Sequence, residues 1–202
     1  MRALLALALL LATVVPASAE PFPRGATFAV FAATADDVED PRFTAELFLA
    51  RALSRELERS GYRSQVLARS VATLAEDNLD EVVKADWFVE ITAADAADGS
   101  YGTIGGFGDR AGAGVSILSS FNAADVTLYE AATLRPLATF RVDARAIMPA
   151  LTSVGAVGDH FWIDLALPLF ERAAANRAAR AFARRAIAEM QHPAEEDQPV
   201  DR

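Results

Sequence analysis

The sequence predicts an α/β fold of the α+β type. In this two-layer sandwich, helices pack against a mixed sheet of four to six strands, and a long helix ends the chain. Short apolar runs of strand length alternate with segments of helical periodicity, which indicates strands and helices in turn. Two later segments alternate apolar and polar residues with a period of two. They predict an antiparallel hairpin and argue against a purely parallel sheet.

The first nineteen residues have the layout of a secretory signal peptide. Arg2 precedes an uncharged apolar run at 3–15, and Ala-Ser-Ala at 17–19 forms the small-residue site that signal peptidase recognises. We therefore expect cleavage between Ala19 and Glu20. Because the apolar run is too short for a stable anchor, no stable membrane insertion is expected after cleavage.

The mature chain is expected to form one domain at residues 20–192, because it is long enough for a core and has no evident internal repeat. The acidic, proline-containing segment 193–202 is expected to be a disordered tail. The chain has no cysteine, which excludes a disulfide framework, a thiol nucleophile and Cys-ligated metal centres. The lipid-modified cysteine of bacterial lipoproteins is missing too, so the sequence predicts a periplasmic protein that is not a lipoprotein.

The formal net charge is −9, with 28 acidic and 19 basic side chains. An acidic chain is repelled by nucleic acid and by anionic membrane surfaces. No nucleic-acid partner is therefore expected, and composition does not predict the oligomeric state.

Sequence patterns predict the following elements in the first half of the domain: a strand at 26–33, a helix from Asp40-Pro41 to Gly61, a strand at 62–68, and a short helix at 79–85 introduced by a capping box at Thr73. The first helix has the strongest pattern, because Leu47, Leu53 and Leu57 recur at helical spacing and Pro at the first position favours a helix start.

The second half is predicted to contain a strand at 86–91, a short strand at 115–118, a hairpin formed by 125–131 and 137–146, and a helical segment at 161–191 that Pro168 bends or divides.

A glycine-rich run at 101–114 (YGTIGGFGDRAGAG) contains a formal match to the dinucleotide fingerprint G-x-G-x-x-G/A, beginning at Gly106. No helical cap or helical period follows it, so the helix N-terminus that would hold a pyrophosphate is not predicted. We therefore expect no cofactor. The run is interpreted as a mobile excursion between two strands, and its residues Tyr101, Phe107 and Arg110 are candidates for contact with a partner.

Acidic residues and histidine suggest one possible catalytic site. Asp109, Asp159 and His160 are of the types that clamp metal ions in phosphoesterases. Such a site needs more histidines than this chain has, since His192 is the only other one. The alternative interpretation of Asp159 is an N-cap before a helix. No common nucleophile or metal motif is found, and no metal site is predicted.

Five arginines of the last predicted helix permit two interpretations: a patch for an acidic partner such as a polyanionic glycan, or a solvated helical face. They are Arg172, Arg177, Arg180, Arg184 and Arg185.

The segments FAVFAA, LARALSRELERSGYRSQVL, KADWFVEI and DVTLYEAATLRPLATFRV, followed by a terminal helix, resemble a domain family of Gram-negative envelope lipoproteins. They are similar also to the domains of the curli-secretion lipoprotein and the penicillin-binding-protein-activator lipoprotein. The resemblance implies a non-catalytic envelope module that binds or assembles with other components, and it brings no catalytic residue to this chain.

Three hypotheses for function follow. The first is an exported, non-catalytic periplasmic binding or assembly module of the cell envelope, whose partner would be an envelope protein or a glycan. The alternative is a metal-dependent hydrolase that uses Asp109, Asp159 and His160, which would have to converge in space. The third is a carrier of a small apolar ligand, which would need a sizeable apolar pocket.

Overall fold

One mixed sheet, covered by helices, organises the molecule. The computed structural model describes residues 22–33, 44–77, 84–107, 111–156, 161–164 and 167–192. The elements in chain order are β1 (Thr27–Ala32), α2 (Ala45–Arg59), β2 (Arg63–Leu67), α3 (Ala72–Asp77), β3 (Trp87–Phe107), β4 (Ala111–Glu130), β5 (Arg135–Ala156), β6 (Phe161–Asp164) and α4 (Leu167–Gln191). The predicted fold class is confirmed.

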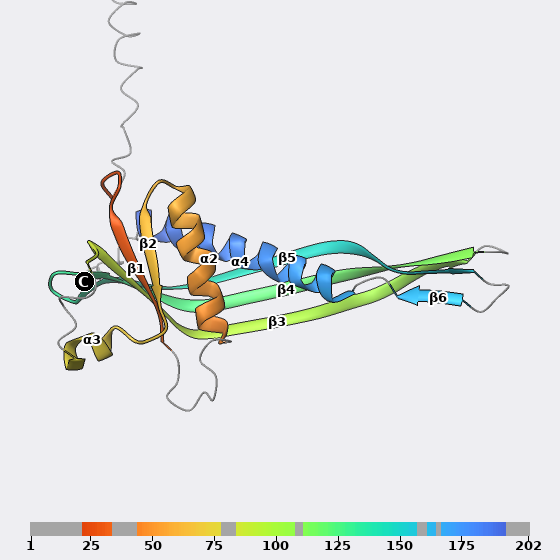
Figure 1. Cartoon of the computed structure of the whole chain (residues 1–202), viewed down its shortest axis with the longest axis horizontal. Coiled ribbons are helices and arrows are strands. Elements are labelled where there is room, and N and C mark those ends of the chain that lie inside the picture. The colour runs from red at the N-terminus through yellow and green to blue at the C-terminus, as the bar shows by residue number, and fades with distance from the viewer. Residues whose placement is uncertain are drawn as a thin grey trace, which may run out of the picture.

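The six strands lie in the order β2-β1-β3-β4-β5-β6. β1 is parallel to both β2 and β3, and the pairs from β3 to β6 are antiparallel, so the sheet is mixed. The three long strands β3, β4 and β5 extend side by side well past α2, and β6 pairs with β5 near the far end (Figure 1). Among the described helices, none is both long enough and apolar enough to cross a membrane.

Helix α2 begins at its cap and ends at a glycine. The Thr44 side chain accepts a hydrogen bond from the Leu47 amide at 3.2 Å, which satisfies one of the free N–H groups of the first turn. The predicted cap at Asp40 lies outside the described residues. Gly61 follows the helix with a φ of +88°, a left-handed conformation that favours glycine, as the sequence predicted for a helix stop.

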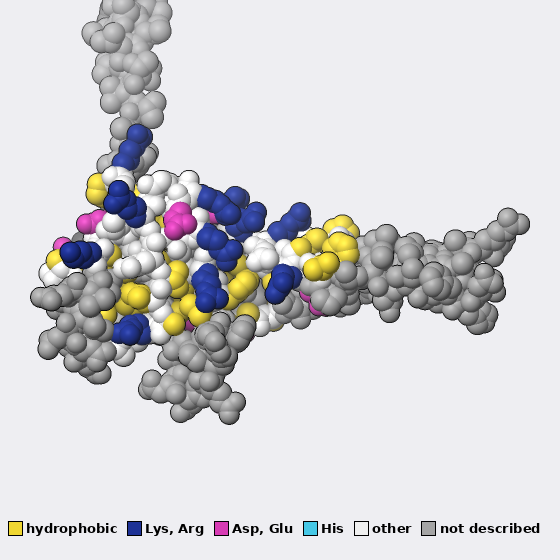
Figure 2. Space-filling view, viewed as in Figure 1, with side chains coloured by type: hydrophobic (Ala, Val, Ile, Leu, Met, Phe, Trp, Pro, Cys, Tyr) yellow, Lys and Arg dark blue, Asp and Glu magenta, His cyan; other side chains and the backbone are white. Residues whose placement is uncertain are grey.

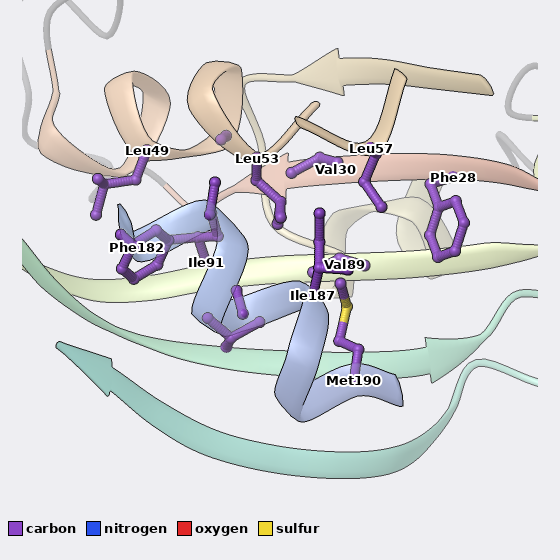
Figure 3. Close-up of a cluster of buried hydrophobic side chains, with 14 of the residues drawn as sticks. Phe28, Val30, Leu49, Leu53, Leu57, Val89, Ile91, Phe182, Ile187 and Met190 are labelled. Carbon is purple, nitrogen blue, oxygen red and sulfur yellow. The ribbon is translucent and has the colours of Figure 1, made fainter. Parts of the chain in front are cut away.

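The main core lies between the sheet and the helices α2 and α4. Strand β1 alternates, so that Phe28 and Val30 point into this core whereas Ala29 and Phe31 point to the opposite face, against α3. Figure 3 shows labelled side chains from α2, α4 and the strands meeting in this layer, and the described members are almost completely buried. They are Phe28, Val30, Leu49, Leu53, Leu57, Val89, Ile91, Phe182, Ile187 and Met190.

The glycine-rich run does not form the predicted mobile excursion. Its described residues continue β3 to Phe107 and begin β4 at Ala111, and the two strands pair down to Phe107 and Gly112. β4 pairs with the β3 residues on one side and with β5 on its other side, so the ladder holds the run in strands although glycine disfavours a strand interior.

One helix prediction needs correction, and another lies largely outside the described residues. The structure has a short helix α3 at Ala72–Asp77, and the Ser70 hydroxyl accepts a hydrogen bond from the Ala72 amide. Of the helix predicted at 79–85, only residues 84 and 85 are described, and they are not helical. Residues 161–164 form β6 rather than the start of a helix. The last helix begins at Leu167 with Pro168 in its first turn, where the missing N–H costs nothing.

Candidate functional site

The outer half of the three long strands is uncharged. Residues 99–107 of β3, 111–120 of β4 and 146–156 of β5 contain no Asp, Glu, Lys or Arg, in a chain that is 23% charged. The register pairs these segments with one another. The uncharged residues therefore form one continuous patch of sheet, which we call the uncharged arm (Figure 1).

One face of the uncharged arm packs on α4. Leu118 and Ala174 are buried together there, with Met148 and Phe170 partly buried against them. Side chains alternate along a strand, so the neighbours of Leu118 and Met148 point to the opposite face.

On that opposite face, several apolar side chains are exposed to solvent. Ile147 is 62% exposed and Ile117 is 37% exposed, and Val115 and Pro149 are exposed beside them. The register sets Ile117 across from Pro149. Grouped apolar exposure of this kind is typical of a contact surface.

The predicted partner-contact residues lie partly on this arm. Tyr101 is in β3, at the register position opposite Ile117, and Phe107 is the last residue of β3, paired with Gly112. Arg110 lies outside the described residues, and so do Asp109, Asp159 and His160 of the hydrolase hypothesis and the cleavage site at Ala19 and Glu20. Within the described part of the chain, no three His, Asp or Glu side chains gather as metal ligands would.

The arginines of α4 lie on the helical layer beside those of α2. Figure 2 shows basic side chains gathered over the region that Figure 1 assigns to these helices. Between the helices is a small groove of 150 Å³, lined by Ala52, Arg55, Arg59, Asn176, Ala179 and Arg180.

Glu56 connects the two helices. This carboxylate of α2 is buried and accepts charged hydrogen bonds from Arg184 Nε at 2.9 Å and from Arg59 at 2.8 Å. The bond from Arg184 is the largest cause of a lowered pKa of Glu56, burial opposes it, and the bond from Arg59 adds to it. Glu56 therefore stays ionised and stabilises the contact between α2 and α4.

Glu90 is a buried acid on the other face of the sheet. Its carboxylate accepts hydrogen bonds from the Ser70 hydroxyl at 2.6 Å, the Val71 amide at 2.9 Å and the Tyr129 hydroxyl at 2.9 Å. Burial, followed by the bond to Glu90, raises the pKa of Tyr129 to about 12. The three donors to Glu90 fix the segment before α3 against this face of the sheet, and the raised pKa keeps the Tyr129 phenol protonated near neutral pH.

Sequence reasoning missed the role of Glu90, because it read DWFVEI only as a buried strand. A charged residue within an otherwise apolar strand was the available signal, since a buried charge requires partners.

A cleft of 580 Å³ lies near α3 and the turn between β4 and β5, and Lys84, Asp86 and Glu130 are among its lining residues. Asp86 accepts hydrogen bonds from the Thr27 amide and hydroxyl at 2.7 and 2.8 Å, and these lower the pKa of Asp86. Most of the other lining residues are apolar, among them Trp87, Phe88 and Leu134, so the cleft has a mixed lining and the carrier of a small apolar ligand stays a hypothesis.

The arrangement of strands and helices is similar to solved structures from Gram-negative bacteria. A Helicobacter pylori protein described as a homolog of the neuraminyllactose-binding hemagglutinin has 14% identity and a TM-score of 0.46, over 86% of this chain and 90% of that chain. A minor lipoprotein from Acinetobacter baumannii has 9% identity and a TM-score of 0.40, over 84% and 94%. Lipoprotein B from Nitrosomonas europaea has 12% identity and a TM-score of 0.35, over 83% and 84%.

No protein-family model matches the chain, and no curated protein sequence matches it. The similar structures agree with the predicted resemblance to Gram-negative envelope lipoproteins at the level of the fold. The narrower resemblance to the curli-secretion and penicillin-binding-protein-activator lipoproteins stays a prediction.

The prediction that the protein is not a lipoprotein is contradicted by this comparison, because two of these three similar structures are lipoproteins. The prediction rested on the absence of one residue type, cysteine.

Proposed function

We propose that the protein is a non-catalytic binding or assembly module of the cell envelope and that it contacts a partner protein through the uncharged arm. The observation that carries the proposal is the group of exposed apolar side chains on the arm face opposite α4: Val115, Ile117, Ile147 and Pro149.

The chemistry of this face favours a protein over a glycan as the partner. Glycans are held by hydrogen-bonding and charged groups together with aromatic rings, whereas Ile117 and Ile147 offer apolar surface alone. Apolar surface binds by removal from water, so the partner must present a matching apolar surface.

Rigid strands support this face. The arm is paired on both sides of β4 over its whole length, so its exposed side chains are held on a preformed surface. A preformed surface loses little conformational entropy on binding, which favours association.

The test is site-specific photo-crosslinking in cells that make the protein. A photoreactive amino acid at position 117 or 147 should crosslink to one defined partner. The same photoreactive amino acid in place of Arg63 or Arg141, two exposed residues away from the arm, should form no such crosslink. The proposal is wrong if the four positions give the same products. It is also wrong if the arm positions give none.

A second measurement separates binding from folding. Ile147→Asp should abolish the crosslink formed from position 117. Ile147 is 62% exposed, so the urea midpoint of the variant should stay close to that of the wild type. A retained crosslink would show that the apolar face does not make the contact.

A further inference from the structure

The groove between α2 and α4 has a floor of small side chains and walls of basic ones. Ala52 of α2 and Ala179 of α4 leave the space open, and Ala179 is buried. Arg55, Arg59 and Arg180 line the sides, so three guanidinium groups border a volume of 150 Å³.

The donors of two of these arginines are largely unused. Arg180 makes no hydrogen bond or ion pair with any residue that the structure describes, and its side chain is exposed. Among the described residues, Arg55 donates from Nε alone, to the Arg51 carbonyl at 3.0 Å. Its two terminal nitrogens remain available for another acceptor.

The acid beside the groove does not neutralise it. Glu56 accepts from Arg59 with one oxygen and from Arg184 with the other, so its single charge is divided between two arginines. The positive charges of Arg55 and Arg180 are left without a counter-charge among the described residues, in a chain whose net charge is −9. An anion would relieve their mutual repulsion.

We propose that this groove binds a phosphate group, either free or as part of a larger molecule. Guanidinium groups present planar forks of N–H donors that match phosphate oxygens, and Asn176, one turn before Arg180 on α4, adds a neutral side chain able to donate. A phosphate has more acceptor oxygens than a carboxylate and carries more negative charge, so it can accept from several of these donors at once.

The site is separate from the surface of the proposed function. The groove lies in the helical layer on one side of the sheet, whereas the exposed apolar residues of the uncharged arm point away from α4. Loss of one contact should leave the other intact, so the two proposals fail independently.

The experiment uses two probes and the full chain. Calorimetric titration with pyrophosphate at constant ionic strength tests a soluble phosphate, and cosedimentation with phosphatidylglycerol vesicles, against phosphatidylcholine vesicles, tests a lipid headgroup. Binding of either probe supports the site, and the probe that binds identifies the source of the phosphate.

Substitutions decide whether the groove is responsible. Arg180→Gln and Arg55→Gln should each weaken binding at least tenfold, because each removes donors from the groove. Arg172→Gln is the matched control, since Arg172 is exposed on the same helix and does not line the groove, and it should change affinity less than twofold. If neither probe binds, or if Arg172→Gln weakens binding as much as Arg180→Gln, the proposal is overturned.

Discussion

The inner and outer halves of β3, β4 and β5 are built differently although one hydrogen-bonded ladder runs through both. The inner half carries Glu90, Asp125 and Arg141 on one face and buried apolar residues on the other, where α2 and α4 cover it. The outer half has no charged residue, and its described side chains include a small buried cluster around Leu118. Burial in the inner half stabilises the fold, and the outer half leaves apolar surface for other contacts.

The largest effect is expected from the inner core. Leu53→Ala removes a fully buried side chain between α2 and the sheet and should lower the free energy of unfolding by about 2–5 kcal/mol, from lost apolar burial and the cavity that remains. Ile147→Ala in the outer half should change it by less than about 0.5 kcal/mol. Urea unfolding followed by circular dichroism measures both.

This pair of variants tests the comparison directly. If Ile147→Ala destabilises the protein as much as Leu53→Ala, the outer half contributes to folding and its apolar residues need no partner to explain them.

An intermediate effect is expected at Glu90. Glu90→Ala leaves the Ser70 hydroxyl, the Val71 amide and the Tyr129 hydroxyl without their acceptor, and each buried donor left unsatisfied costs about 1–3 kcal/mol unless water reaches it. Tyr129→Phe is the milder companion, because it removes one donor and leaves the carboxylate two others.

The Tyr129 titration gives this prediction a second readout. The pKa of Tyr129 in the folded protein is about 12, above its ordinary value of 10, so ultraviolet absorbance should show one tyrosine that ionises late. Its raised pKa stabilises the fold below pH 10, and this contribution is lost as pH rises toward 12. In Glu90→Ala the late titration should move toward 10, and an unchanged titration would contradict the assigned contact.

Local sequence patterns were sufficient to predict the elements of the inner half of the fold. The apolar run of β1, the leucine spacing of α2, the glycine at position 61 and the alternation of β4 and β5 around their turn each carry a strong periodic or conformational pattern. β1 and α2 lie within a few residues of their predicted bounds, whereas β4 and β5 contain the predicted hairpin strands and extend well beyond them.

The outer half was predicted only in part, as the short strand at 115–118, because most of its strand residues lack such a pattern. Residues 99–107 and 111–114 are rich in glycine, whose own preference is against strands, and only pairing with partners distant in sequence makes them extended. The arginine groove was missed for a related reason. Arg55 and Arg180 are 125 positions apart, and no local pattern predicts that two helices cross where they lie.

The smallest effect on stability is expected at Glu56, whose charge connects α2 to α4. The pKa of Glu56 is lowered from its ordinary value of 4.5, chiefly by the hydrogen bond from Arg184. A lowered pKa stabilises the fold above pH 4.5, and the contribution is lost as pH falls through the folded-state value. Glu56→Gln should therefore be less stable than the wild type by about 1 kcal/mol at pH 7, since both arginines are exposed, and the difference should shrink on acidification.

The measurement is urea unfolding of both proteins between pH 7 and pH 3. Asp86, whose pKa is also lowered, titrates in both proteins, so subtracting one curve from the other isolates Glu56. The uncharged arm contains no Asp or Glu, so it does not contribute to the pH dependence of either unfolding curve in this range. If the difference in free energy of unfolding between the two proteins stays constant with pH, Glu56 stabilises the fold through its shape and not through its charge. The ion pairs of Glu56 would then not be evidence that charge stabilises the inner half.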